Sequence, residues 1–312
     1  MSVQSSATVK FGTPLPARSA GLTWGLVGVA AFSFTMPLTR VAVDGLSPLF
    51  VGSGRAVVAA VLAGVTLAVT RQTVPGGKQW LRIAVVAAGV VVGFPVLTSY
   101  ALSVTPASHG AIVVGLLPAA TAVTAVLRTG EQPERTFWLF SLAGAISAVV
   151  FALLQSGGIG RIHWADLLLF GAVLAAAVGY SEGALLAREI GSWQTVSWAL
   201  VLSSPLMLTL TGIAFGRRTP SGTAVEWACF AYLSAVSMYL GFFAWYRGLA
   251  IGPMSRVSQA QLVQPVMSIC WAALLLGEYI GWLTFVGGLV VIACAGGAVR
   301  NRLGGADTAP KG

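Results

Sequence analysis

The sequence predicts an all-α integral membrane protein of ten transmembrane helices, arranged as two inverted five-helix repeats around a central cavity. Three observations predict this fold class: the apolar composition, the number of apolar stretches, and residues that recur at a fixed offset. Of the 312 residues, 56% are hydrophobic and 9% are charged, and the mean hydropathy is +0.85. Soluble domains carry about 25% charged residues, so we expect this chain to lie in a lipid bilayer.

Ten apolar stretches each approach the roughly 20 residues that a helix needs to cross a bilayer. Short segments rich in glycine, proline and charge separate them, and none is long enough to form a soluble domain. Such segments include VDGLSP (43–48), TRQTVPGGKQ (70–79), TGEQPER (129–135), QSGGIGR (155–161) and GRRTPSG (216–222). The predicted spans are 22–42, 48–69, 80–102, 107–127, 136–154, 164–187, 193–215, 224–246, 256–277 and 281–299.

The basic residues predict the orientation of the chain. With ten crossings, thirteen lysines and arginines fall on the side of both termini and four on the other side. The positive-inside rule therefore predicts cytoplasmic termini in the cell inner membrane, with flexible tails at 1–20 and 301–312. Although the net charge is +9, the basic residues are scattered singly, so no nucleic-acid partner is expected.

A repeated pattern indicates that the chain contains two copies of one unit. LSVTPASHGAIVVGLLP (102–118) matches LAIGPMSRVSQAQLVQP (249–265) at an offset of 147 residues, and further matches occur at an offset of 148. Each copy holds five spans, so the second copy enters the membrane from the opposite face. We therefore predict repeats at 21–157 and 158–300, which is typical of secondary transporters. The predicted hinges are the paired prolines Pro106, Pro118, Pro253 and Pro265.

These repeats resemble the EamA-type branch of the drug/metabolite transporter superfamily. The shared features are the proline loop before the fourth helix of each repeat, a second proline twelve residues on, and a Gly-Glu pair at 130–131 and 277–278. Arg55 matches an arginine that such proteins carry in the second helix. Within the branch the chain looks most like YddG-type exporters of aromatic amino acids. The resemblance implies a central cavity and export of amino acids or related metabolites; another metabolite or drug class is the alternative.

Polar and aromatic side chains on the spans around that cavity are the candidate substrate ligands. On the ninth span, Gln261, Gln264 and Trp271 follow helical spacing, and amides suit zwitterions because they both donate and accept. Aromatic walls suit a bulky apolar solute. For the amides the alternative is helix-to-helix hydrogen bonding, and for the aromatic residues it is contact with lipid. The remaining candidates are Phe34, Pro37, Ser99, Tyr100, His109, Tyr180, Tyr239, Phe242 and Trp245.

Three ionisable residues within the spans have competing interpretations, because charge in a membrane is costly and often functional. We expect Arg55 to reach the interface or to pair with Asp44, although it could also serve the site. Glu182 is expected at the cytoplasmic interface beside Arg188, with proton coupling as the alternative. For His109 the alternatives are a cap or loop histidine and a substrate contact.

An intramembrane serine hydrolase is the competing class of protein. GYSEG (179–183) fits the G-x-S-x-G pattern of a nucleophile elbow around Ser181. That elbow needs a strand-to-helix turn and a nearby histidine, and an apolar helix provides neither. We therefore predict no catalytic residues. We also expect no metal or cofactor, since Cys229, Cys270 and Cys294 lie unpaired in apolar runs. The expected functional unit is a monomer that handles a small molecule.

Overall fold

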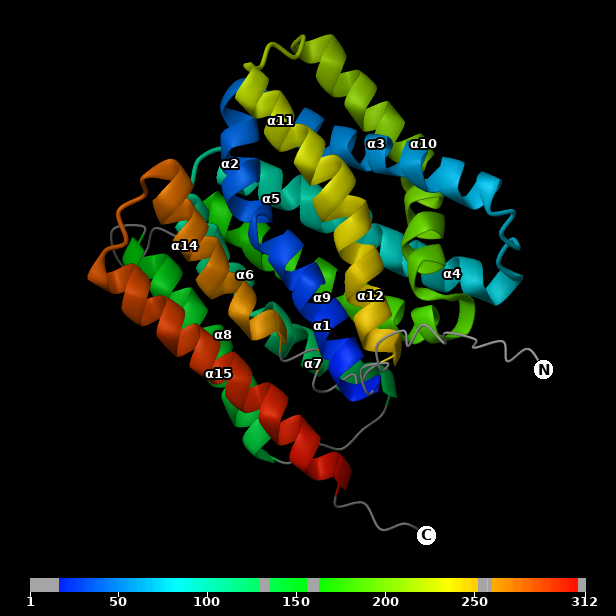
Figure 1. Ribbon diagram of the computed structural model, residues 1–312. Coiled ribbons are helices and arrows are strands. Elements are labelled where there is room, and N and C mark those ends of the chain that lie inside the picture. Colours follow the sequence, from blue (N-terminus) through cyan, green and yellow to red (C-terminus); the bar gives the residue numbers. More distant parts are fainter. Residues whose placement is uncertain (1–16, 130–134, 156–162, 252–256, 258–259, 308–312) are drawn as a thin grey trace, which may run out of the picture.

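A computed structural model describes residues 17–129, 135–155, 163–251, 257 and 260–307, and its regular elements are all helices (Figure 1). Seven helical runs in this part are long and apolar enough to cross a membrane. Three shorter apolar helices, Arg135–Phe151, Ala260–Leu276 and Trp282–Gly297, lie at the remaining predicted spans. The predicted all-α membrane fold is confirmed.

We number the spans 1 to 10 along the chain. The end of the bundle where span 1 begins and span 10 ends is called the terminal face, and the opposite end is the distal face. The helices are α1 (Ala17–Ser33) and α2 (Thr35–Gly45) in span 1; α3 (Pro48–Val69) in span 2; α4 (Gly77–Val86), η1 (Ala87–Gly93) and α5 (Phe94–Leu102) in span 3; α6 (Ala107–Val114) and α7 (Leu117–Thr129) in span 4; α8 (Arg135–Gln155) in span 5; α9 (Trp164–Ile190) in span 6; α10 (Ser192–Arg217) in span 7; α11 (Ala224–Tyr232), η2 (Leu233–Leu240) and α12 (Gly241–Ile251) in span 8; η3 (Ala260–Val263) and α14 (Gln264–Leu276) in span 9; and α15 (Trp282–Asp307) in span 10.

Some boundaries differ from those that the sequence predicts. Helix α1 already begins at Ala17, and α15 continues to Asp307, so both helices enter the predicted tails. Span 9 is not one continuous helix, because a 3-10 turn, η3, precedes α14. Two predicted features, the hinge Pro253 and the Gly-Glu pair at 130–131, lie outside the described residues.

The helical irregularities recur at the repeat offset. Span 3 contains the π-helix η1 and span 8 the π-helix η2, and a shift of about 147 residues superimposes them. Span 4 breaks between α6 and α7, and span 9 breaks at η3. Pro118 and Pro265 each occupy the second position of the helix that follows, where a missing N–H breaks no helical bond. The two halves therefore share the same points of weakened helix bonding.

Helix packing follows the same inverted repeat. Spans 2 and 7 pack as α3 against α10, and spans 5 and 10 pack as α8 against α15, so each packs on its own counterpart (Figure 1). Span 1 packs along span 8, and span 3 packs along span 6. Spans 1 and 6 are counterparts, and so are spans 3 and 8. Exchanging the two halves therefore turns the contact of spans 1 and 8 into that of spans 6 and 3, as a pseudo-twofold axis requires.

Glycines allow the close approach in both of these exchanged contacts. Between spans 1 and 8, a Cβ atom added at Gly248 would lie 2.7 Å from the backbone nitrogen of Gly25. Between spans 3 and 6, a Cβ added at Gly179 would lie 2.6 Å from Cγ2 of Val90. Small residues let membrane helices pack backbone to backbone, where dispersion contacts hold them together.

Replacing Gly248 with leucine should therefore lower the melting temperature of the detergent-solubilised protein, because overpacking costs about 1–3 kcal/mol. Gly212 on α10 is the matched control, since a Cβ there would meet no atom of the described residues within 4 Å. Gly212→Leu should leave the melting temperature unchanged or slightly raised, because leucine favours helix more than glycine does. Equal melting temperatures for the two variants would contradict the packing role of Gly248.

Candidate functional site

A cavity lies between the two halves, in contact with spans 1, 2, 3, 6, 8 and 9. The cavity volume is about 20 Å³, slightly more than the roughly 10–15 Å³ that one water molecule needs. This site must therefore widen to admit a metabolite. Its described lining consists of Phe32, Thr35, Arg55, Val90, Phe94, Pro95, Tyr180, Ser237, Met238, Phe242 and Gln264.

Much of this lining is paired by the repeat. Three pairs of lining residues are related by an offset of 147 or 148: Phe32 with Tyr180, Val90 with Ser237, and Pro95 with Phe242. The cavity therefore lies where the two copies face each other. Gln264 breaks the pairing, because its counterpart at an offset of 147 is Leu117.

Arg55 is the charged group of the cavity. Its residue is 2% exposed, and its Nε has no hydrogen-bond partner among the residues that the structure describes. None of the described lining residues is acidic. The expected pairing with Asp44 is wrong, since Asp44 forms an ion pair with Arg40. The expected reach to the interface is also wrong, because burial keeps the guanidinium away from water.

An unpaired buried cation is unfavourable unless an anion compensates it. The planar guanidinium offers five N–H donors in a geometry that matches carboxylate or phosphate oxygens. Arg55 therefore gives the cavity the chemistry of an anion site.

The two predicted glutamines are both buried, and their positions differ. Gln264 lines the cavity, and its Oε1 has no hydrogen-bond partner in the described part of the chain. Gln261 is 2% exposed, and its Nε2 has no hydrogen-bond partner among the described residues, but it is absent from the described lining. An unpaired carbonyl oxygen accepts hydrogen bonds, so Gln264 suits an ammonium or another donor.

Aromatic rings form one wall of the cavity. The centroids of Phe32 and Phe242 are 4.7 Å apart, and the Tyr180 ring meets Phe242 edge-on at 5.8 Å. Behind them, Trp245 lies with its centroid 6.3 Å from that of Tyr180. Such a wall provides a broad apolar contact surface for a ring-bearing solute.

Several predicted ligands lie outside the described lining and have partners within the protein. The Ser99 hydroxyl donates to the carbonyl oxygen of Pro95 at 2.7 Å, and Tyr239 shares a 3.2 Å hydrogen bond with Ser197. Trp271 stacks on Phe34 with centroids 4.5 Å apart. The other predicted ligands that are absent from the described lining are Pro37, Tyr100, His109 and Trp245.

His109 is part of a buried pair rather than a cap or loop. Its Nε2 lies 2.7 Å from Oδ1 of Asp166, and both side chains are at most 4% exposed. Asp166 also accepts from the backbone N–H of His163 in a capping box at the start of α9. The pair joins span 4 to span 6 near the distal face.

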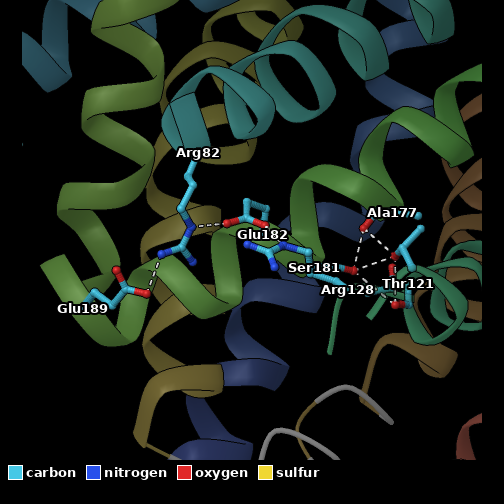
Figure 2. Close-up of polar contacts among 8 residues, drawn as sticks. Arg82, Thr121, Arg128, Ala177, Ser181, Glu182 and Glu189 are labelled. Carbon is cyan, nitrogen blue, oxygen red and sulfur yellow. Dashed lines mark hydrogen bonds and ion pairs between the residues drawn. The ribbon is translucent and has the colours of Figure 1, made fainter. Parts of the chain in front are cut away.

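Glu182 has different partners from the expected Arg188. Its carboxylate pairs with Arg82 of α4 and accepts from Nε of Arg128 on α7 at 2.8 Å. Arg82 also pairs with Glu189, so these four residues form a charge cluster near the terminal face (Figure 2). Sequence reasoning missed Arg82 and Arg128, because they come from other spans and no spacing along the chain connects them to Glu182.

Ser181, the residue of the elbow pattern, lies within the continuous helix α9. Its Oγ is 2.6 Å from Oγ1 of Thr124 and 2.9 Å from the carbonyl oxygen of Ala177. The contact with Thr124 joins span 6 to span 4, whereas the contact with Ala177 lies within α9, and neither is a nucleophile–base pair.

Glu278, the acid of the second Gly-Glu pair, caps helix α6. Its Oε1 and Oε2 accept from the backbone N–H groups of Ala107 and Ser108 at 2.7 and 2.9 Å. Gly277 adopts a left-handed conformation, φ +65°, that ends α14 and directs the chain toward this cap. The Gly-Glu pair therefore ties the second repeat to the first at the distal face.

Glu278→Ala should lower the free energy of unfolding by about 1 kcal/mol, because it removes two capping hydrogen bonds and a favourable charge at a helix N-terminus. Glu278→Gln retains an acceptor and should lose less. Thermal unfolding in detergent measures the difference. Tyr279→Ala is a suitable control, since Tyr279 is 92% exposed; a loss of equal size in that variant would rule out the cap as the cause.

Comparisons with known proteins agree with this architecture. The model of the EamA-like transporter family matches residues 19–153 and again 163–299. The chain is 43% identical over 279 residues to an uncharacterized transporter, YdeK, of Bacillus subtilis (strain 168), covering 88% of this chain and 96% of that protein. A crystal structure covering 94% of this chain and 100% of its own has a TM-score of 0.62 at 17% identity, a likeness of fold alone. The chain is therefore a multi-pass membrane transporter, not an enzyme, and it belongs to the EamA-like transporter family.

Proposed function

We propose that the protein exports amino acids, with aromatic ones favoured, across the cell inner membrane. The observation that carries this proposal is Arg55, a buried guanidinium in a cavity whose described lining has no acid. A substrate carboxylate would compensate this charge. The unpaired Oε1 of Gln264 suits the ammonium group, and the wall of Phe32, Tyr180 and Phe242 suits an aromatic side chain.

Alternating access is the mechanism that we propose. Its support is the inverted pairing of the spans, the recurrence of π-helical segments in spans 3 and 8, and the breaks in spans 4 and 9. Rocking of the two halves would widen the cavity toward one face and then the other. The prolines Pro106, Pro118 and Pro265 lie at the starts of helices, where such a bend is accommodated. In this proposal both termini lie in the cytoplasm, and one chain is sufficient.

Exchange in proteoliposomes tests the substrate class. Purified protein should exchange labelled phenylalanine for unlabelled phenylalanine or tryptophan, whereas protein-free liposomes should not. Phenethylamine lacks the carboxylate and should not compete, while 3-phenylpropionate lacks the ammonium and should compete weakly. The proposal fails if unlabelled phenylalanine and tryptophan neither exchange with labelled phenylalanine nor compete with it for transport.

Export of a different organic anion is the second candidate, because Arg55 alone would accept any carboxylate or phosphate. In the same assay, exchange of such an anion without exchange of phenylalanine would favour that candidate.

A further inference from the structure

Two side-chain clusters flank the cavity, one toward each face, and they occupy equivalent positions in the repeat. Glu182 on span 6 is the counterpart of Phe34 on span 1 at an offset of 148 residues. Thr124 on span 4 is the counterpart of Trp271 on span 9 at an offset of 147. The two members of each pair therefore occupy equivalent positions in the two repeats.

The hydrogen bond that anchors each cluster is also repeated. At the terminal side, Ser181 Oγ lies 2.6 Å from Thr124 Oγ1 and joins span 6 to span 4. At the distal side, Trp271 donates from Nε1 to Ser33 Oγ at 3.0 Å and joins span 9 to span 1. Ser33 and Ser181 are counterparts at an offset of 148. One contact between equivalent spans thus exists in two copies, one on each side of the cavity.

The chemistry built on this shared contact differs between the two sides. At the distal side the Phe34 ring stacks on Trp271 at 4.5 Å and meets the Tyr232 ring edge-on at 5.8 Å. We call these three residues the aromatic seal. At the terminal side Glu182 replaces the phenyl ring and holds Arg82 and Arg128 (Figure 2). We call these three residues the ionic latch.

The latch is buried at its centre and exposed at its edge. The Glu182 side chain is 7% exposed, while those of Arg82 and Arg128 are 21% and 53% exposed. Separating these spans would leave the Glu182 carboxylate partly desolvated without its partners, which is strongly unfavourable. A cavity of about 370 Å³ reaches the latch, lined in part by Thr124, Arg128, Ser181 and Glu182. The aromatic seal, in contrast, contains no charged side chain.

We propose that the ionic latch closes the cavity toward the terminal face and that the aromatic seal closes it toward the distal face. Opening at one face then requires breaking ion pairs, and opening at the other requires parting stacked rings. Both are formed at once in this structure, in keeping with the small central cavity. The inference rests on the alternating access proposed above, but it is independent of the substrate class.

Sided thiol labelling tests this assignment without any substrate. In a chain whose three cysteines, Cys229, Cys270 and Cys294, are replaced by alanine, Ser237→Cys places a reporter in the cavity lining. A membrane-impermeant maleimide is added to vesicles whose orientation is read from a tag at the C-terminus. Failure of phenylalanine exchange would not affect this readout, so the two proposals fail separately.

Glu182→Gln should raise reporter labelling from the terminal face by about 10-fold or more, because a charge-assisted hydrogen bond shifts an equilibrium by at least that factor. Labelling from the distal face should stay within about twofold of the parent, the size of effect expected for a site that lost no contact. Phe34→Ala should give the opposite pattern. Arg128→Gln, which leaves Glu182 paired with Arg82, is a milder second variant in case Glu182→Gln fails to fold.

Arg40→Gln is the matched control, since it breaks an exposed ion pair within helix α2. It should leave labelling from both faces unchanged. The proposal is overturned if folded Glu182→Gln and Arg128→Gln label as the parent does, or if either raises labelling equally from both faces. It is also overturned if Phe34→Ala opens the terminal face.

Discussion

Arg55→Gln should lower the rate of substrate exchange about 100-fold, the effect of losing about 2.7 kcal/mol from a hydrogen bond to a charged group. Arg55 is the one basic residue in the described lining of the cavity, and its Nε has no partner among the described residues. Glutamine keeps N–H donors on a shorter side chain and removes the charge. Exchange of phenylalanine in proteoliposomes measures the loss.

The same variant should keep or raise the melting temperature. Replacing a buried charge that has no compensating acid relieves a desolvation penalty, whereas replacing one member of a structural ion pair costs stability. Arg55→Lys retains the charge but not the bidentate geometry and should recover part of the activity. A folded Arg55→Gln protein that exchanges phenylalanine at the parental rate would show that Arg55 does not bind substrate. A sharply lowered melting temperature would instead indicate a structural role.

The fold was predictable because its determinants are local or repeated. Each span is apolar over the length that a bilayer requires, and the breaks between spans contain glycine, proline and charge. The matches at offsets of 147 and 148 predict the inverted architecture from the sequence alone. The same offsets relate η1 to η2 in the structure, although no residue pattern in either segment indicated a π-helix.

The partners of the charged residues were not predictable, because they depend on how the spans cross. Glu182 lies six residues from Arg188 on one helix, yet its carboxylate reaches Arg82 and Arg128 on two other spans. Arg55 lies eleven residues from Asp44, yet Arg40 takes that acid. Residues close in sequence form the exposed pair of Arg40 with Asp44, whereas the buried Glu182 is paired across helices.

The cavity contact of Gln264 leads to a prediction that separates the two glutamines. Gln264→Leu should weaken apparent binding of phenylalanine about 10-fold, the effect of losing one hydrogen bond to a charged ammonium. Leu117 occupies the equivalent position in the first repeat, so we expect the helix to accommodate the substitution. Gln261→Leu is the matched control, because Gln261 is equally buried but is not part of the described lining.

The ligand series makes this test specific. Competition by 3-phenylpropionate, which has no ammonium, should be unaffected by Gln264→Leu, because the carboxylate still meets Arg55. Loss of affinity for both ligands would indicate that the substitution distorts the cavity rather than removing an ammonium acceptor. Equal loss in Gln261→Leu and Gln264→Leu would assign both amides to helix packing, which stabilises membrane helices by about 1 kcal/mol per hydrogen bond. Loss of affinity for phenylalanine, with no loss for 3-phenylpropionate, would place the substrate ammonium at Oε1 of Gln264 and its carboxylate at Arg55.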